Sequence, residues 1–178
     1  METSEDTRQY VLFRLGPEEY GLPVSTVSSI IRYEQPTPVP QAPPQVDGVI
    51  NVRGRVIPVV NLLRALSGRD EPISAMSRIV ITEGDAGTVG VVVDSANEVA
   101  TIPLSTIVPA PESVLSAVTA EAFEGVADVG GRLVILVRLD TILPRVAFSH
   151  SSHAVGPASA AAAAGDDAAK PSEGDTDA

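Results

Sequence analysis

Short apolar runs separated by turn residues recur along most of the chain. Tyr10–Leu15 ends at Gly16-Pro17 and the apolar pattern resumes at 19–22, which predicts a hairpin because Gly and Pro favour turns. The same combination of an apolar run and a following turn predicts further strands at 31–34, 48–52, 56–60, 78–82, 88–94, 98–103, 123–129 and 132–137. This pattern is typical of an all-β fold.

Helical periodicity is confined to short segments. Pro23 fits the first turn of a helix over 24–29, in which Val24 and Val27 lie three residues apart on one face, and Ile30 continues this spacing. Five prolines within 36–44 predict an extended connection, because proline has no N–H to donate to a sheet. Further short helices are predicted at 61–68, 112–120 and 140–143.

The apolar part of the sequence contains an internal repeat. The segment 48–62 aligns with 125–139, and seven of the 15 paired positions are identical. More weakly, the segment 20–30 aligns with 89–99. Two copies are too few for a solenoid, so the repeat predicts two small β-barrels of similar build that pack together. The alternative, in which two hairpins rich in Val and Gly only look alike, stays open on the alignment alone.

Composition supports a β fold and limits the partners. Val and Ile total 36 residues against 14 for Leu and Met, and branching at Cβ favours strands. The net charge of −11 argues against nucleic acid, and against direct contact with an anionic membrane surface. The sequence has no Cys, and its polar, acidic N-terminus does not resemble a signal peptide, so we expect a cytoplasmic protein.

The two ends of the sequence differ from the rest. Residues 1–7 are polar, and residues 149–178 form an acidic, Ala-rich segment with almost nothing large to bury, so both are expected to be disordered. The predicted domain therefore covers 8–147. Within it, the second of two interlocked barrels is expected mainly from about 78 to 137.

Residue types needed for catalysis or metal binding are scarce. His150 and His153 are the only histidines, and they follow the predicted domain, where a disordered tail would offer only two ligands. The carboxylate pairs at 18–19 and 70–71 are adjacent in sequence, so their side chains point apart. We therefore expect no catalytic residues, no metal site and no cofactor.

The repeat gives an internal comparison for Arg53. Its counterpart in the second copy is Gly130, and a Gly-Gly turn closes such a hairpin more easily than Arg-Gly. Placing Arg at this position predicts a role for its side chain, since a guanidinium can anchor a carboxylate or several carbonyl groups. An intramolecular bond between the barrels and a contact with a partner explain the residue equally well.

Several short motifs follow one another in a fixed order. They are Tyr10–Leu15 with Tyr20–Val24, Pro43–Gly48, an Asn-x-Arg-Gly-x-x-x-Pro element at 51–58, Val89–Asp94 with Glu98-Val99, Ile107–Pro111, and 125–137. Together they resemble the CheW-type chemotaxis coupling proteins over about residues 8–146. The resemblance implies two packed, five-stranded SH3-like β-barrels with short helices.

The resemblance also implies a function. It implies a non-catalytic adaptor that joins the cytoplasmic tip of a methyl-accepting chemoreceptor to a CheA-type histidine kinase, and that reaches receptor arrays through these partners. Kinase contacts in the family use the first barrel. The positions that match the family's receptor-binding groove are Val27, Ile30, Gly48, Val49, Arg53 and Gly54.

Two departures from the family pattern keep other interpretations open. Ser28-Ser29 replaces an acidic residue of many members, and Asn61-Leu62-Leu63 replaces the usual Asp-Leu-Arg, which puts a salt link at that strand end in doubt. One alternative is an adaptor of another two-component pathway, such as type IV pilus motility or developmental signalling. A small-ligand β-barrel enzyme is a second alternative, and it would require a deep pocket around Asp94, Glu98 or Asp128.

Overall fold

The computed structural model describes residues 5–85, 87–109 and 120–143. These residues form two five-stranded sheets joined by short helices, which confirms the predicted all-β class. The predicted C-terminal tail, most of the predicted helix at 112–120, and both histidines lie outside the described residues.

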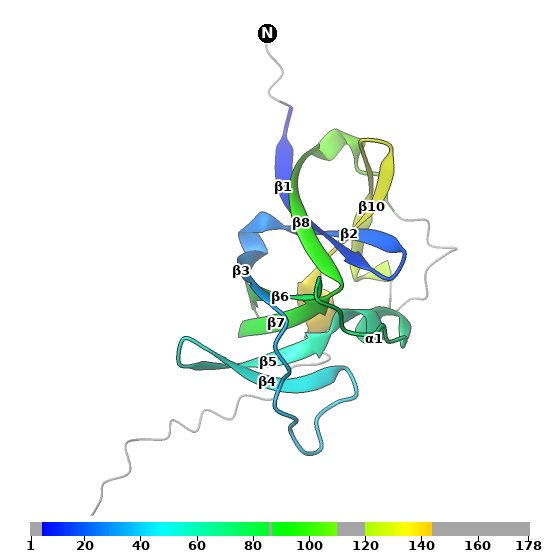
Figure 1. The fold of residues 1–178 in the computed structure, drawn as a ribbon. Coiled ribbons are helices and arrows are strands. Elements are labelled where there is room, and N and C mark those ends of the chain that lie inside the picture. The colour runs from blue at the N-terminus through cyan, green and yellow to red at the C-terminus, as the bar shows by residue number, and fades with distance from the viewer. Residues whose placement is uncertain (1–4, 86, 110–119, 144–178) are drawn as a thin grey trace, which may run out of the picture. The chain divides into compact units, whose positions relative to one another are not determined.

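Two sheets, here called sheet A and sheet B, contain the strands of the described residues, most of which are labelled in Figure 1. Sheet A has the strand order β8-β1-β2-β10-β9, and sheet B has the order β3-β6-β7-β5-β4. The strands of sheet A are β1 (Thr7–Leu15), β2 (Glu18–Pro23), β8 (Ser95–Pro103), β9 (Phe123–Val129) and β10 (Arg132–Val137). Those of sheet B are β3 (Val27–Arg32), β4 (Val46–Val52), β5 (Arg55–Asn61), β6 (Arg78–Gly84) and β7 (Gly87–Val93).

The two halves of the chain exchange strands. In the order of the repeat, β1 to β5 correspond to β6 to β10, and this correspondence maps the strand order of sheet A onto that of sheet B. Each sheet therefore takes a hairpin from one half and three strands from the other. Residues 78–137, from which the second barrel was mainly expected, are divided: β8, β9 and β10 lie in sheet A, whereas β6 and β7 pair with β3 and β5 in sheet B.

The strand registers confirm the internal repeat. In sheet A, Gly21 pairs with Leu136 in the parallel contact between β2 and β10. In sheet B, Gly90 pairs with Val59 in the corresponding contact between β7 and β5. A Cβ atom on either glycine would lie within 2.9 Å of an aliphatic carbon inside its sheet. Both positions therefore require glycine because another strand approaches closely on the interior side.

An additional pair of backbone hydrogen bonds joins the two edges of each sheet. Thr37, which follows β3, exchanges N–H···O bonds of 2.8 and 2.9 Å with Val49 of β4. Val108, which follows β8, exchanges bonds of 2.9 and 2.8 Å with Val126 of β9. Because each bridge joins the first edge of a sheet to its last edge, both sheets close into barrels. Hereafter they are called barrel A and barrel B.

Three apolar clusters stabilise this arrangement. One cluster fills barrel A and includes Tyr10, Leu12 and Leu136. A second fills barrel B, with Ile57 and Ile79 among its members. The third and largest lies between the barrels and takes residues from both, among them Phe13, Leu22, Val60, Val91, Val137 and Leu139. Alternate side chains of one strand thus point into a barrel interior and into the shared cluster, because successive side chains of a strand point to opposite faces.

The helices are short and start where strands end. They are η1 (Val24–Thr26), α1 (Leu62–Ser67), η2 (Leu104–Thr106) and α3 (Leu139–Ile142). The helix predicted over 24–29 is wrong, since only one 3-10 turn forms before β3 begins at Val27. Val27, Ile30 and Ile31 are branched at Cβ, and pairing with β6 overrides their weak helical spacing.

The ordered structure begins earlier than the sequence predicts. Thr7 already belongs to β1, and the carbonyl of Asp6 accepts a hydrogen bond of 2.8 Å from the N–H of Leu104. Residues 5–7, predicted to be disordered, are therefore held against the start of η2.

Candidate functional site

The turn between β4 and β5 has the same geometry as the turn between β9 and β10. Gly54 donates its N–H to the side-chain oxygen of Asn51 at 2.9 Å, and Gly131 donates to Asp128 at 2.8 Å. The residue before each glycine has positive φ, 52° at Arg53 and 61° at Gly130. This conformation is easy for glycine and costs an L-residue about 1 kcal/mol. Arg53 therefore occupies a position that its own backbone disfavours.

No intramolecular contact explains the choice of arginine at this turn. Arg53 is exposed, and no ion pair or side-chain hydrogen bond of Arg53 occurs within residues 5–85, 87–109 and 120–143. Of the two roles open from the sequence, a bond between the barrels is therefore excluded for the described residues. The guanidinium is available to a partner.

Gly48 is a structural requirement of the barrel. It is buried, its φ is 144°, and a Cβ atom there would overlap the carbonyl of Thr37, which bridges to Val49. Its equivalent, Gly125, faces the carbonyl of Val108 in the same way. Gly48 thus permits barrel closure, and the half-buried Val49 beside it holds the closing bridge.

The outward face of the β4–β5 hairpin is partly apolar. Ile50 and Ile57 point into barrel B, so Val49, Val56 and Pro58 lie on the opposite face. Val49 pairs with Pro58, and Val56 is 69% exposed, which is high for an aliphatic side chain. The sequence did not single out Val56. The alternation of 56 with the buried positions 57 and 59 is the signal that could have identified it.

The six predicted groove residues fall into two groups on the two edge strands of sheet B. Val27 packs against the shared cluster from β3, and Ile30 on the same strand is 40% exposed. The other four lie on β4 and its turn, at the opposite end of the strand order. The bridge from Thr37 to Val49 connects the two groups through the segment after β3.

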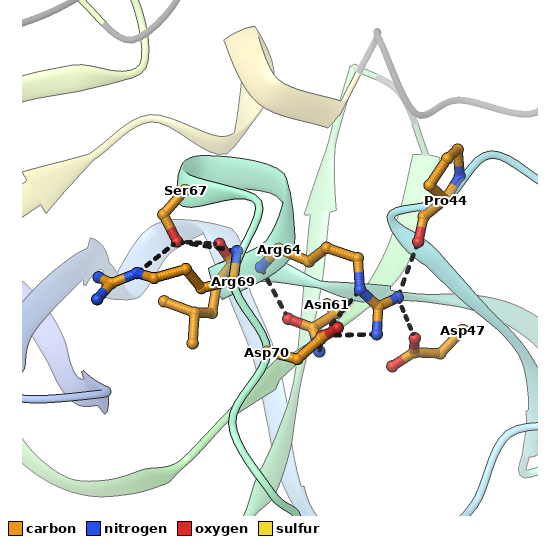
Figure 2. A network of polar contacts seen from close by, with 8 residues as sticks. Pro44, Asp47, Asn61, Arg64, Ser67, Arg69 and Asp70 are labelled. Carbon is orange, nitrogen blue, oxygen red and sulfur yellow. Dashed lines mark hydrogen bonds and ion pairs between the residues drawn. The ribbon is translucent and has the colours of Figure 1, made fainter.

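A polar network at the end of β5 holds three segments together (Figure 2). Asn61 caps α1 by accepting a hydrogen bond of 3.0 Å from the N–H of Arg64. The Arg64 guanidinium lies between two carboxylates, at 2.8 Å from Asp47 and 2.7 Å from Asp70, and it donates to the carbonyl of Pro44 at 2.8 Å. Hydrogen bonding to Asp70, above all, raises the pKa of Arg64 above its usual value.

The salt link that the sequence put in doubt is therefore present in a changed form. Asn61 takes the capping role, and the cation is Arg64. Its contact with Asp47 fixes the residue directly before Gly48. Sequence reasoning missed Arg64. The signal that could have found it is an arginine three residues after an Asn at the helix N-cap position.

The carboxylates that an enzyme would require have separate structural contacts. Asp94 accepts a hydrogen bond of 2.6 Å from the N–H of Gly16, and Asp128 holds the turn at Gly131. Glu98 forms an ion pair with Arg132 at 2.9 Å. Across the described ranges, no group of three His, Cys, Asp or Glu side chains could hold a metal ion. No helix in the same ranges is long and apolar enough to span a membrane.

Comparisons with known proteins agree with this architecture. The family model of the CheW-like domain matches residues 9–147. The chain is 31% identical over 137 residues to the chemotaxis protein CheW of Rhizobium meliloti (strain 1021), covering 77% of this chain and 88% of that protein. It is 34% identical over 135 residues to the chemotaxis protein CheW of Bacillus subtilis (strain 168), covering 76% and 86%.

Two further similarities extend the comparison. The protein FrzA of Myxococcus xanthus is 33% identical over 104 residues, which cover 58% of this chain and 65% of that protein. Among solved structures, the scaffolding protein TtCheW from Thermoanaerobacter tengcongensis has a TM-score of 0.68 at 29% identity, covering 78% of this chain and 89% of that chain.

Proposed function

The chain belongs to the CheW-like domain family and is a chemotaxis coupling adaptor, and on this premise we propose that it joins the cytoplasmic tip of a methyl-accepting chemoreceptor to a CheA-type histidine kinase. The family is known as a non-catalytic scaffold. We extend this to the present chain, which acts by binding alone. Its location follows from its partners: it is cytoplasmic and is recruited to receptor arrays through them.

The receptor-binding surface lies on barrel B. Val27, Ile30, Gly48, Val49, Arg53 and Gly54 define it, and Val56 extends its apolar part. The observation that carries the assignment is Arg53, an exposed arginine at positive φ with no partner among the described residues. A residue that costs folding energy and makes no contact within the fold is expected where binding requires it.

The chemistry of this surface suits reversible association. Exposed aliphatic side chains supply affinity when they are buried against a partner, at about 25 cal/mol per Å² before association costs are subtracted. Arg53 fixes how the partner is aligned on the surface, since a guanidinium binds a carboxylate or carbonyl groups with defined geometry. This combination fits a dissociation constant on the order of micromolar, as a switchable scaffold requires.

The direct test is calorimetric titration of the full chain with a soluble chemoreceptor tip fragment, and separately with the regulatory domain of a CheA-type kinase. We expect both to bind. Arg53→Ala is expected to weaken receptor binding about tenfold and to leave kinase binding unchanged. Arg14→Ala, an exposed arginine on barrel A, is the matched control for receptor binding. Absence of receptor binding by the unmodified chain would contradict the proposal.

A related adaptor role in another two-component pathway, type IV pilus motility or developmental signalling, is the second candidate. It is favoured by the two departures from the family pattern, at Ser28-Ser29 and at Asn61-Leu62-Leu63. The identity of the bound partners separates the two. Affinity capture of the tagged chain from its own cells, followed by mass spectrometry, would show whether the retained receptor and kinase belong to a flagellar pathway.

A further inference from the structure

We propose that Arg55 is a second receptor-contacting residue, and that it binds a carboxylate supplied by the receptor tip segment. The inference rests on the proposed function and adds the chemistry of the partner. Its basis is a difference between the two barrels at equivalent positions.

At the end of barrel A, an arginine is neutralised from within the chain. Arg132 forms ion pairs of 2.9 Å with Glu19 of β2 and with Glu98 of β8. Hydrogen bonding to Glu98 and the charge of Glu19 raise the pKa of Arg132. This Glu-Arg-Glu group joins three strands.

The strand registers identify the equivalent group in barrel B. The repeat aligns Arg132 with Arg55, and the hairpin pairings align Glu19 with Thr88. Glu98 pairs with Leu12 of β1, and Ser29 pairs with Ile81 of β6, which is the repeat equivalent of Leu12. Ser29 therefore takes the place of Glu98. Barrel B therefore has the arginine, but hydroxyl groups stand where barrel A has carboxylates.

Arg55 accordingly has no charged partner among the residues that the structure describes. Its guanidinium donates a hydrogen bond of 3.0 Å to the Thr88 hydroxyl. Glu83, which pairs with Thr88 across β6 and β7, is the nearest carboxylate by register, yet it forms no ion pair with Arg55. In the described part of a chain with a net charge of −11, Arg53 and Arg55 are thus two unpaired cations only two residues apart.

The position of Arg55 matches the proposed binding surface. It directly follows the turn that carries Arg53 and directly precedes the exposed Val56. A segment that covers Val56 would shield Arg55 from water, which strengthens an ion pair and makes an unmatched charge costly. The complementary partner is therefore an apolar segment with at least one Asp or Glu next to its contact residues.

The test compares Arg55→Gln with the matched variant Arg132→Gln. Both remove one exposed guanidinium from equivalent positions of the two barrels. Titration with the receptor tip fragment at about 50 mM and about 300 mM NaCl measures affinity and its salt dependence. We expect Arg55→Gln to weaken binding about tenfold at low salt and to flatten the salt dependence. Arg132→Gln is expected to change affinity less than about twofold, because Glu19 and Glu98 of the same chain already form ion pairs with that side chain.

A second pair of variants tests the assigned geometry. Thr88→Glu places a carboxylate where barrel A has Glu19, so it should pair with Arg55, which already donates to the Thr88 hydroxyl, and weaken receptor binding several-fold. Thr88→Gln has the same size without the charge and should weaken binding less. Arg55→Lys keeps the charge and should recover part of the affinity lost in Arg55→Gln. Circular dichroism melting curves confirm that each variant is folded.

The outcomes separate the inference from the function on which it rests. If the unmodified chain does not bind the receptor fragment, the proposed function fails and the inference with it. If the unmodified chain binds, and Arg55→Gln binds equally well with the same salt dependence, the inference alone is overturned. An equal loss in Arg132→Gln would also overturn it, because the effect would then reflect overall charge.

Discussion

Barrel A and barrel B are two versions of one design that share their backbone arrangement and differ in side-chain charge. Both have the same strand order, the same glycine between strands and the same closing bridge. They differ at the turn, where barrel B has Arg53 for Gly130, and at the barrel end, where it has Thr88 for Glu19. The comparison teaches that backbone geometry restrains the shared positions, and that the copies differ in the exposed charges to which the proposed function assigns binding.

The largest expected effect concerns barrel closure. Gly48→Ala would drive a Cβ atom into the Thr37 carbonyl at a positive φ, whereas Gly125→Ala meets Val108 at 2.7 Å without a positive φ. We expect Gly48→Ala to lower the free energy of unfolding by about 3 kcal/mol and Gly125→Ala to lower it less. Urea unfolding monitored by circular dichroism measures both. Equal losses would show that the two closures are under the same strain.

A smaller loss is expected where the copies diverge after their last strands. Arg64 joins Pro44, Asp47 and Asp70, while its repeat equivalent, Thr141, donates to the carbonyls of Arg138 and Glu121. Arg64→Ala should cost about 1 to 2 kcal/mol of stability, and Thr141→Ala about 1 kcal/mol or less.

Amide hydrogen exchange can distinguish the two variants Arg64→Ala and Thr141→Ala. Loss of the Arg64 network should increase exchange at the amide of Val46, whose N–H is bonded to the Pro43 carbonyl in the segment held by Arg64. Thr141→Ala should leave that amide protected. Unchanged protection in Arg64→Ala would contradict a positioning role for this side chain.

Making the two turns alike is expected to have opposite effects on folding and binding. Arg53→Gly gives barrel B the Gly-Gly turn of barrel A and removes the unfavourable positive φ. Stability should rise by up to about 1 kcal/mol, while affinity for the receptor fragment falls about tenfold. Thermal melting and calorimetry on the same sample test this. A fall in stability together with affinity would mean that Arg53 holds the fold and is not reserved for a partner.

The smallest effect is expected at the exposed Glu-Arg-Glu group of barrel A. Glu98→Gln removes one of the two carboxylates around Arg132, and the side chains of Glu98 and Arg132 are each 46% exposed. Ion pairs of this exposure contribute little in water, so the melting temperature should stay unchanged within error. A clear decrease would show that this group stabilises barrel A.

The sequence was a reliable guide to local structure and to the family. Turn residues such as Gly16-Pro17 and Gly130-Gly131 located the hairpins, and the aligned positions of the repeat are structurally equivalent. The resemblance to CheW-type proteins is confirmed by the family match over residues 9–147. The assignment of the receptor groove stays a prediction. The helix over 24–29 was wrong because its spacing is local, whereas pairing with β6 depends on residues 46 to 55 positions away.

Tertiary structure decided which strands share a barrel. The apolar pattern of the sequence predicts strands and turns but does not say which strands pair, whereas in the structure side chains such as Phe13 of β1 and Val91 of β7 meet in the shared cluster. The same holds for charge. Arg55 and Arg132 are equivalent in the sequence, yet Arg132 has two carboxylates within ion-pair distance and Arg55 has none among the described residues, because those neighbours come from distant strands. Local residue types determine strands and turns, and long-range packing determines which side chains remain free to bind.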